Sequence, residues 1–140
     1  MKTMVCYIDG SFKPSHPTKV GSAIVIVKEN DETEEIFFSK DDAELAKQRN
    51  VGGELRASMV AIKTAIDRGY DKIQIFYDYL GIEMWGTSKW KTNNRYTKAY
   101  RDYCSEMSKY IDIEFIKVNA HSGVYYNELA DYFAKKSLEL

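Results

Sequence analysis

The 140-residue chain has only two cysteines, Cys6 and Cys104, and they form no CxxC pair. Such a sparse set indicates neither a zinc site nor a disulfide framework, so reduced thiols are expected. The sequence also lacks any run of 18 apolar residues, and its amino terminus carries no long apolar stretch. These absences argue against export and membrane insertion and predict a soluble, cytoplasmic protein.

An excess of positive charge is missing too. The formal net charge is −1 and the pI is near 6.1, whereas nucleic-acid binders are normally basic. The charges are nevertheless unevenly placed, because residues 29–44 hold eight acids and one lysine while residues 89–101 hold five cations and no acid. The basic segment would attract a polyanion, although two solvated charged surfaces explain the pattern equally well.

The length and the 44% hydrophobic content suit one domain, residues 1–140, with a single core. No internal repeat, low-complexity tract or linker divides the chain. In the first half, residues 4–11, 20–28 and 34–38 have the composition of strands and are separated by turn residues. They predict an antiparallel three-stranded start.

Helical periodicity begins after these strands. Apolar residues recur at spacings of four, three and four from Leu55 to Ile66, and Gly69 closes the segment. The second half then alternates strands and helices, with strands expected at 72–77 and 112–118 and helices at about 97–109 and 124–138. This alternation implies an α/β fold in which crossovers join parallel strands.

Four acidic residues take distinctive places in this scheme. Asp9 and Asp78 fall at the carboxyl ends of strands, where α/β sheets present their ligand crevice, and Glu54 opens the first long helix. Asp131 lies four residues after Asn127, on the same face of the last helix. Converging carboxylates repel one another and are most simply neutralised by divalent cations. A metal-dependent active site is the resulting hypothesis.

Taken singly, these acids are weaker signals. Glu54 in a first helical turn is ordinary dipole complementation, and an aspartate such as Asp78 commonly ends a strand. Asp9 is more telling, because it shares strand parity with Val5 and Tyr7 in an otherwise apolar strand, where an unpaired buried acid is costly.

The most specific pattern is the carboxyl-terminal block from Ile116 to Lys135. It contains His-Ser-Gly followed by Asn-x-x-Ala-Asp-x-x-Ala, and it resembles the strand, loop and final helix of type 1, bacterial RNase HI-like, ribonucleases H. The motifs Asp9-Gly-Ser, Gly-Glu-Leu-Arg-Ala and Tyr-Asp-Tyr precede it in the family's order. The resemblance therefore spans nearly the whole chain.

This resemblance implies a ribonuclease H-like fold: a mixed five-stranded sheet of order 3-2-1-4-5, flanked by helices. The activity that it implies is endonucleolytic hydrolysis of the RNA strand of RNA–DNA hybrids by a two-metal-ion mechanism, giving 5′-phosphate and 3′-hydroxyl ends. The hybrid is the expected partner. No membrane and no obligatory protein partner are indicated.

Carried over residue by residue, the resemblance assigns the metal ligands to Asp9, Glu54, Asp78 and Asp131, with Asp9 as the bridge between two Mg²⁺ ions. Oxygen ligands suit Mg²⁺, with Mn²⁺ as a possible substitute, and the lack of a Cys/His cluster disfavours zinc. His121 is the candidate for proton transfer or for helping product leave, since imidazole titrates near neutral pH.

Substrate recognition requires groups that read a 2′-hydroxyl. The resemblance points to Asn50 for this contact, with Ser11 and Asn127 as further candidates, and Arg49 stands where the family often has threonine. Residues 81–91 resemble the helix and short basic segment that grip the DNA strand. Its candidate contacts are Trp85, Lys89 and Lys91, although packing of the tryptophans on the core is the alternative.

Two rival functions stay open. Another two-metal nuclease or a transposase-like enzyme would share the fold, but the His-Ser-Gly loop and the Asn-x-x-Ala-Asp helix disfavour both. A catalytically silent hybrid-binding module is the rival from a different class. The presence of all four acids disfavours it.

Overall fold

The computed structural model describes residues 1–119 and 124–140. Its centre is a mixed five-stranded sheet of order β3-β2-β1-β4-β5, as predicted. β1 pairs antiparallel with β2, which pairs antiparallel with β3, while β4 runs parallel to β1 and β5 parallel to β4. The strands are β1 (Thr3–Ser11), β2 (Lys19–Val27), β3 (Thr33–Asp41), β4 (Lys72–Tyr77) and β5 (Asp112–Lys117).

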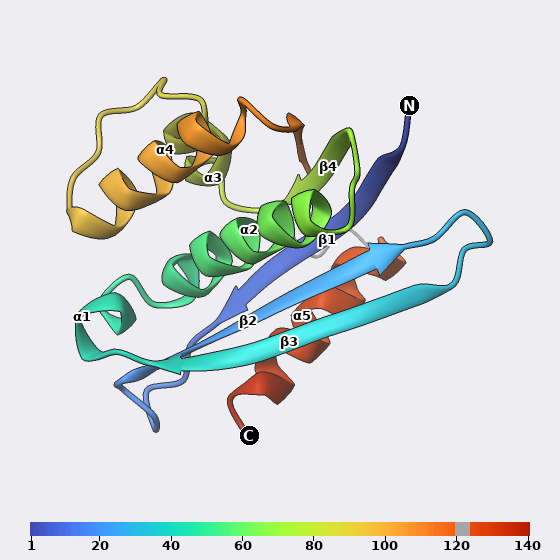
Figure 1. Ribbon diagram of the computed structural model, residues 1–140. Coiled ribbons are helices and arrows are strands. Elements are labelled where there is room, and N and C mark those ends of the chain that lie inside the picture. Colours follow the sequence, from blue (N-terminus) through green and yellow to red (C-terminus); the bar gives the residue numbers. More distant parts are fainter. Residues whose placement is uncertain (120–123) are drawn as a thin grey trace.

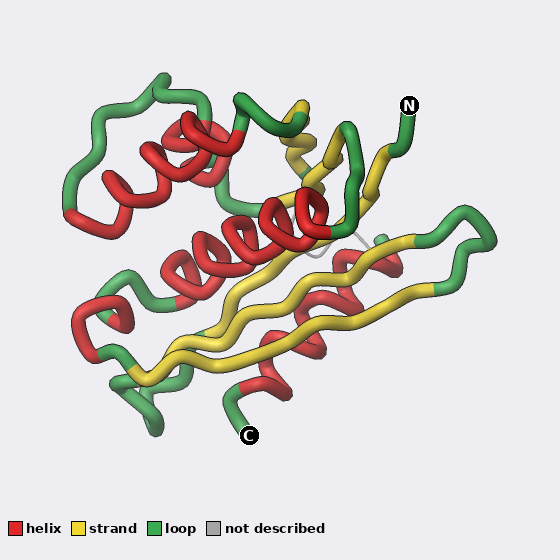
Figure 2. Tube along the Cα trace, in the orientation of Figure 1, coloured by secondary structure: helices red, strands yellow, loops and turns green. Residues whose placement is uncertain are grey.

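Helices cover both faces of this sheet (Figures 1 and 2). Helix α2 crosses one face against β1 and β2, with α3 and α4 beside it, and α5 lies on the opposite face against β1, β2 and β3. The helices are α1 (Ala43–Ala46), α2 (Asn50–Asp67), α3 (Gly81–Gly86), α4 (Arg95–Met107) and α5 (Tyr125–Ser137). The main core lies between the sheet and α2, α3 and α4.

Burial along the strands follows this layering. In β1 the fully buried residues Met4, Cys6 and Ile8 alternate with partly exposed Val5 and Tyr7, so the two faces of the strand meet different layers. β2 is buried along nearly its whole length because helices cover both of its faces. The predicted parity of Asp9 with Val5 and Tyr7 therefore places its side chain on the α5 side.

The start of α2 differs from the sequence prediction. Glu54 does not open this helix, because α2 already begins at Asn50 and Glu54 lies in its second turn. The preceding glycines allow the helix to begin this close to the sheet. A Cβ on Gly53 would overlap the carbonyl oxygen of Gly21, and a Cβ on Gly10 would overlap the backbone of α2. Backbone contact thus brings the Asp9 strand and the Glu54 helix together.

Two short helices were not among those predicted from periodicity. The four-residue α1 was not expected, and the Asp42 side chain caps it by accepting from the N–H groups of Glu44 and Leu45. Helix α3 agrees with the helix that the resemblance implied after Asp78. Helix α4 begins two residues earlier than predicted because Asn94 and Thr97 form a capping box.

The remaining limits are close to those expected. Gly69, with a φ of 77°, follows the end of α2 as predicted, since glycine adopts left-handed backbone angles without a Cβ clash.

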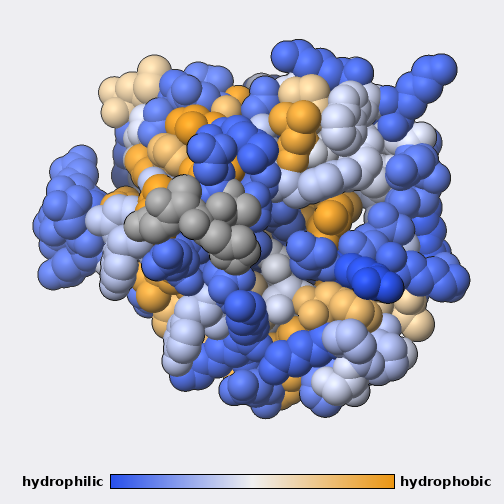
Figure 3. Space-filling view, turned by 180° about the vertical axis from the view of Figure 1, so that it is seen from behind, coloured by the Kyte–Doolittle hydropathy of each residue, from blue (hydrophilic) through white to orange (hydrophobic). Residues whose placement is uncertain are grey.

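Across residues 1–119 and 124–140, no helix combines the length and apolar character that a membrane span requires. Figure 3 shows the α5 side as mostly hydrophilic, with hydrophobic residues in separate patches.

Candidate active site

The predicted acids meet at the carboxyl end of β1 and β4. A cavity of about 110 Å³ opens there between the sheet, α2 and α5. Its lining residues come from four segments of the chain and are Asp9, Gly10, Asn50, Asp78, Asn127, Glu128 and Asp131. Three of the four predicted metal ligands therefore share one small, acidic cavity.

Asp9 is the central acid of this cavity. Burial raises its pKa to about 7, and the nearby charges of Asp131 and Asp78 add to the rise, while a hydrogen bond from the Gly10 N–H opposes it. A carboxyl group in this state is poised to exchange its proton for a cation.

Glu54 lies behind the cavity. It is buried, and its two carboxylate oxygens accept hydrogen bonds from the backbone N–H groups of Asp78 at 2.9 Å and Tyr79 at 3.3 Å. Burial raises its pKa to about 8, the negative charges of Asp9 and Asp78 contribute, and the two backbone hydrogen bonds oppose the rise. Glu54 thereby ties α2 to the turn that presents Asp78.

Asp131 reaches the cavity from α5. Its Oδ2 lies 2.9 Å from Nζ of Lys135, one helical turn further on. Asn127, one turn before Asp131, also lines the cavity and is buried. The structure thus brings Asn127 and Asp131 onto one helix face over the crevice.

The chemistry of this set suits a hard divalent cation, because every side chain offers oxygen and like charges are crowded together. In the described part of the chain, however, no three Asp, Glu, His or Cys side chains converge as a ready-made metal cluster. Two of the acids are oriented by protein groups: Glu54 by backbone N–H groups and Asp131 by Lys135.

The predicted substrate contacts divide into two groups. Asn50 is exposed at the start of α2 and lines the cavity, so its amide is available beside the acids. Ser11 is buried at the end of β1 and is not among the residues lining this cavity. Its neighbour in the sheet is Gly21.

Trp85 packs inside the molecule. It is only 5% exposed, and its indole N–H donates to the Lys91 carbonyl at 3.3 Å. Trp90, which is 38% exposed, meets it edge-on, and Tyr79 contacts both rings. The packing interpretation therefore applies to Trp85, and Trp90 and Tyr79 present the exposed aromatic surface of this cluster.

Lys89 and Lys91 flank Trp90 in the segment between α3 and α4, and both are exposed. Further along, Lys98 and Arg101 each pair with Asp102. Among the described residues, Lys89 and Lys91 make no salt bridge. Arg95 is likewise without a salt bridge in the described residues, but its guanidinium donates to the Tyr96 hydroxyl at 2.7 Å. Lys89 and Lys91 are the available cations beside Trp90.

His121 lies outside the described residues, so the structure does not place it relative to the four acids. Glu128 was not predicted, yet it lines the cavity. The signal was present in the sequence, since Glu128 directly follows Asn127 at the start of a helix whose next turn carries Asp131.

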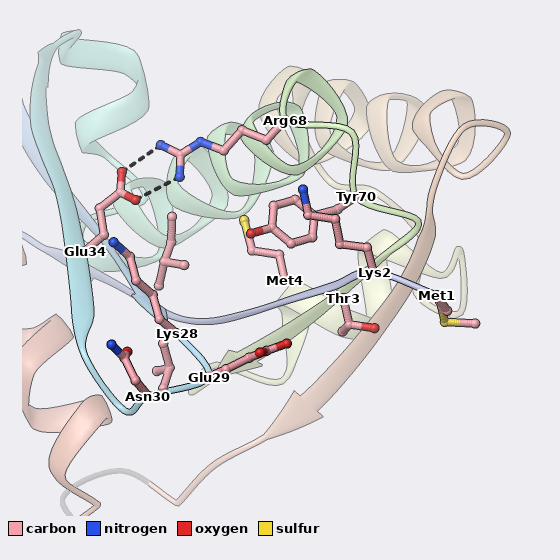
Figure 4. A pocket seen from close by; sticks show the side chains of 12 residues that line it. Met1, Lys2, Thr3, Met4, Lys28, Glu29, Asn30, Glu34, Arg68 and Tyr70 are labelled. Atoms are coloured by element: carbon pink, nitrogen blue, oxygen red, sulfur yellow. Dashed lines mark hydrogen bonds and ion pairs between the residues drawn. The ribbon is translucent and has the colours of Figure 1, made fainter.

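A larger cavity, about 590 Å³, lies at the opposite end of β1 (Figure 4). Arg68 and Glu34 pair there through two hydrogen bonds of 2.8 and 2.6 Å, and Lys2 lies over the ring of Tyr70. Its charges are of mixed sign, and the clustered acids with raised pKa values are elsewhere. The volume of a cavity alone therefore does not identify the candidate active site.

Comparison with known proteins agrees with this geometry. The family model described as RNase H matches residues 1–139. The chain belongs to the RNase H family. Membership over this length identifies it as a ribonuclease H enzyme and confirms the resemblance drawn from its motifs.

Solved structures show the same fold. RNase H1 from the halophilic archaeon Halobacterium salinarum NRC-1 is 24% identical, with a TM-score of 0.79 and 98% of both chains covered. The N-terminal RNase H domain of Rv2228c from Mycobacterium tuberculosis is 16% identical, with a TM-score of 0.79 and 99% and 95% of the two chains covered.

A third similar structure is LC11-RNase H1 in complex with an RNA/DNA hybrid. It is 17% identical, with a TM-score of 0.72 and 96% and 99% coverage. At these identities the likeness establishes the fold. A sequence comparison with curated proteins found no match.

Proposed function

We propose that Asp9, Glu54, Asp78 and Asp131 form a two-metal site that hydrolyses the RNA strand of RNA–DNA hybrids, giving 5′-phosphate and 3′-hydroxyl ends. The observation that carries this proposal is the shared cavity, onto which three of these acids open while Glu54 supports it from behind. The activity is the one for which the RNase H family is named, and a related enzyme of the same fold has been solved with an RNA/DNA hybrid.

The acids would hold two Mg²⁺ ions, with Mn²⁺ as a substitute and Asp9 between them. When bound, such ions supply an activated water and stabilise charge on the leaving oxygen. The protein contributes the arrangement of ligands. The raised pKa values of Asp9 and Glu54 imply that metal binding releases protons, because the ions bind the carboxylate forms.

Substrate selection is assigned to the amides beside the acids. Asn50 and Asn127 line the cavity from opposite helices, and an amide both donates to and accepts from a ribose 2′-hydroxyl. Ser11 is a supporting residue in this proposal because it is buried and does not line the cavity. The proposed role of His121 in proton transfer or product release rests only on the sequence motif.

Contacts to the DNA strand are assigned to the basic segment after α3. Exposed Lys89 and Lys91 would meet phosphates, while buried Trp85 supports the exposed ring of Trp90. These lysines are important because the chain as a whole carries a net charge of −1. Attraction to a polyanion must therefore be local.

We further propose that the 140 residues work as one catalytic domain in a reducing, cytoplasmic compartment. Both cysteines are free and buried, and burial raises the pKa of the Cys6 thiol to about 12. Neither thiol is then suited to rapid disulfide exchange, because the thiolate is the reactive form.

Cleavage of three end-labelled substrates tests the activity: an RNA–DNA hybrid, duplex RNA and duplex DNA, each with Mg²⁺ or EDTA. We expect cleavage of the hybrid's RNA strand in Mg²⁺ alone, with products that carry a 5′-phosphate. Binding of the hybrid without cleavage would instead identify a silent binding module. Cleavage of duplex DNA at a comparable rate would identify a different nuclease of the same fold.

A further inference from the structure

A lysine reaches one of the candidate metal ligands. The ammonium Nζ of Lys135 lies 2.9 Å from Oδ2 of Asp131, with both residues on α5 and one turn apart. Asp131 is partly buried at the cavity, with a side chain 33% exposed, whereas the Lys135 side chain is 60% exposed. The lysine therefore approaches the acid from the solvent side.

This contact distinguishes Asp131 from the other acids of the cavity. In residues 1–119 and 124–140, Asp131 forms a salt bridge, whereas Asp9, Glu54 and Asp78 form none. The positive charge therefore falls on an acid whose own charge acts on Asp9. Lys135 reduces the repulsion within the acidic cluster while no divalent cation is bound.

We propose that Lys135 is a tethered counter-cation that competes with a divalent ion for Asp131 and thereby sets the affinity of the site for metal. This inference rests on the proposed function. An ammonium group 2.9 Å from Oδ2 repels a divalent ion that approaches the same oxygen, so binding of the ion through Oδ2 favours displacement of the lysine. Lys135 acts through Asp131 and is a positioning residue.

Displacing Lys135 from Asp131 costs little free energy. An exposed ion pair between residues four apart on a helix is worth less than about 1 kcal/mol, and the exposed lysine stem can turn into solvent. Lys135 therefore tunes the metal concentration at which the site fills without blocking it. Its removal should tighten metal binding, in contrast to the loss expected when a ligand is removed.

The neighbouring lysine provides a matched control. Lys136 carries the same charge one residue further on, but its Nζ lies over the ring of Tyr132, 5.7 Å from the centroid, and it makes no salt bridge with a described carboxylate. Substituting Lys136 changes the net charge of α5 by the same amount. Only substitution of Lys135 removes the contact with Asp131.

The test is titration of the substrate-free protein with Mn²⁺, followed by electron paramagnetic resonance of the free ion. Lys135→Met should lower the dissociation constant of the weaker ion by about threefold to fivefold, the range that an exposed ion pair allows. Lys135→Arg should stay near the wild type, and Lys136→Met should change it by less than about twofold.

Variants that also lack the Asp131 carboxylate test whether Lys135 acts through this residue. In Asp131→Asn, which lacks the paired carboxylate, adding Lys135→Met should leave Mn²⁺ affinity unchanged. Equal affinities of Lys135→Met, Lys136→Met and wild type would overturn the inference while leaving the proposed function intact. If the wild type cleaves no hybrid and binds no Mn²⁺, the proposed function itself fails.

Discussion

Glu54 fixes the backbone of Asp78. Its Oε2 accepts a hydrogen bond from the Asp78 N–H at 2.9 Å, and Oε1 accepts one from the adjacent Tyr79 N–H. A side chain of α2 thus holds the turn that follows β4. Two acids 24 residues apart in the sequence are positioned by this contact, which leaves the Asp78 side chain free to face the cavity.

Asp78→Asn should abolish Mg²⁺-dependent cleavage while preserving the fold. The amide keeps the shape of the side chain but loses the charge that a metal ligand needs, and the hydrogen bond to Glu54 involves only the backbone N–H. Hybrid cleavage and the thermal melting of the same preparation provide the measurement. Near-normal turnover by a folded variant would remove Asp78 from the metal site.

Without metal, the stability of the protein should fall as the pH rises from about 5.5 to 8. Asp9 and Glu54, with folded pKa values raised to about 7 and 8, hold protons in this range that the unfolded chain has already lost. Folding is then favoured by low pH, and the loss across the window should be about 2–4 kcal/mol. Below pH 5 acids with a lowered pKa, such as Asp42, act in the opposite direction.

Urea unfolding in EDTA at several pH values measures this effect. Glu54→Gln has no proton to lose and should flatten the pH dependence, while Mg²⁺ should restore stability at pH 8. A wild-type stability that is level or rises across the window contradicts the prediction.

Replacing Lys89 and Lys91 with glutamine should weaken hybrid binding and reduce its salt dependence. Each lost phosphate contact lowers the slope of log affinity against log salt by about 1. Trp90→Ala should weaken binding with little change in slope, because loss of stacking releases no counterions. Binding of both variants should be measured in the inactive Asp78→Asn background, so that the hybrid is not cleaved. An unaltered salt dependence in the lysine variant would show that this segment is only a solvated surface.

Asn50→Ala should lower the catalytic efficiency on hybrids by weakening contact with a 2′-hydroxyl. Loss of one hydrogen bond in a desolvated contact is worth about 1–3 kcal/mol. The side chain is exposed in the free protein, so its removal should leave the melting temperature nearly unchanged. Unchanged efficiency on the hybrid would exclude Asn50 as a substrate contact.

Gly53→Ala should destabilise the protein by about 2–4 kcal/mol, because the new methyl overlaps the Gly21 carbonyl oxygen. Gly52→Ala is a milder comparison, since it makes the same gain in helix propensity and its methyl would lie 2.9 Å from the Leu45 carbonyl oxygen, so a smaller destabilisation is expected. Chemical denaturation compares the two. Equal stability of both variants would show that the close approach of α2 to the sheet is not tight.

Much of this architecture was predictable from the sequence. Periodicity located five strands and three long helices because their apolar faces repeat regularly, and the motifs identified the acids that meet at the cavity. Local sequence patterns did not predict the limits of elements that depend on tertiary contacts or on a single side chain. The helical start at Asn50 depends on Gly53 fitting against β2, and the four-residue α1 depends on a single capping side chain.

Side-chain roles were less predictable than positions. The sequence does not reveal that Trp85 is inside and Trp90 outside, because both lie in the same polar segment. It likewise does not show that Asp131 is paired with Lys135, since that contact depends on the rotamers of exposed residues. Motifs locate the acids, and burial and hydrogen bonding determine the state of each.

The glycine contact between β1, β2 and α2 divides the site into a rigid half and an adjustable half. Asp9 and Glu54 stand on backbones that already touch, so their spacing cannot widen or shrink without moving the core. Glu54 holds the backbone of Asp78 but leaves its side chain free to turn, and Asp131 is oriented by a displaceable lysine. Adaptation to ions of different radius, or to successive stages of a reaction, must therefore come from the second pair of acids.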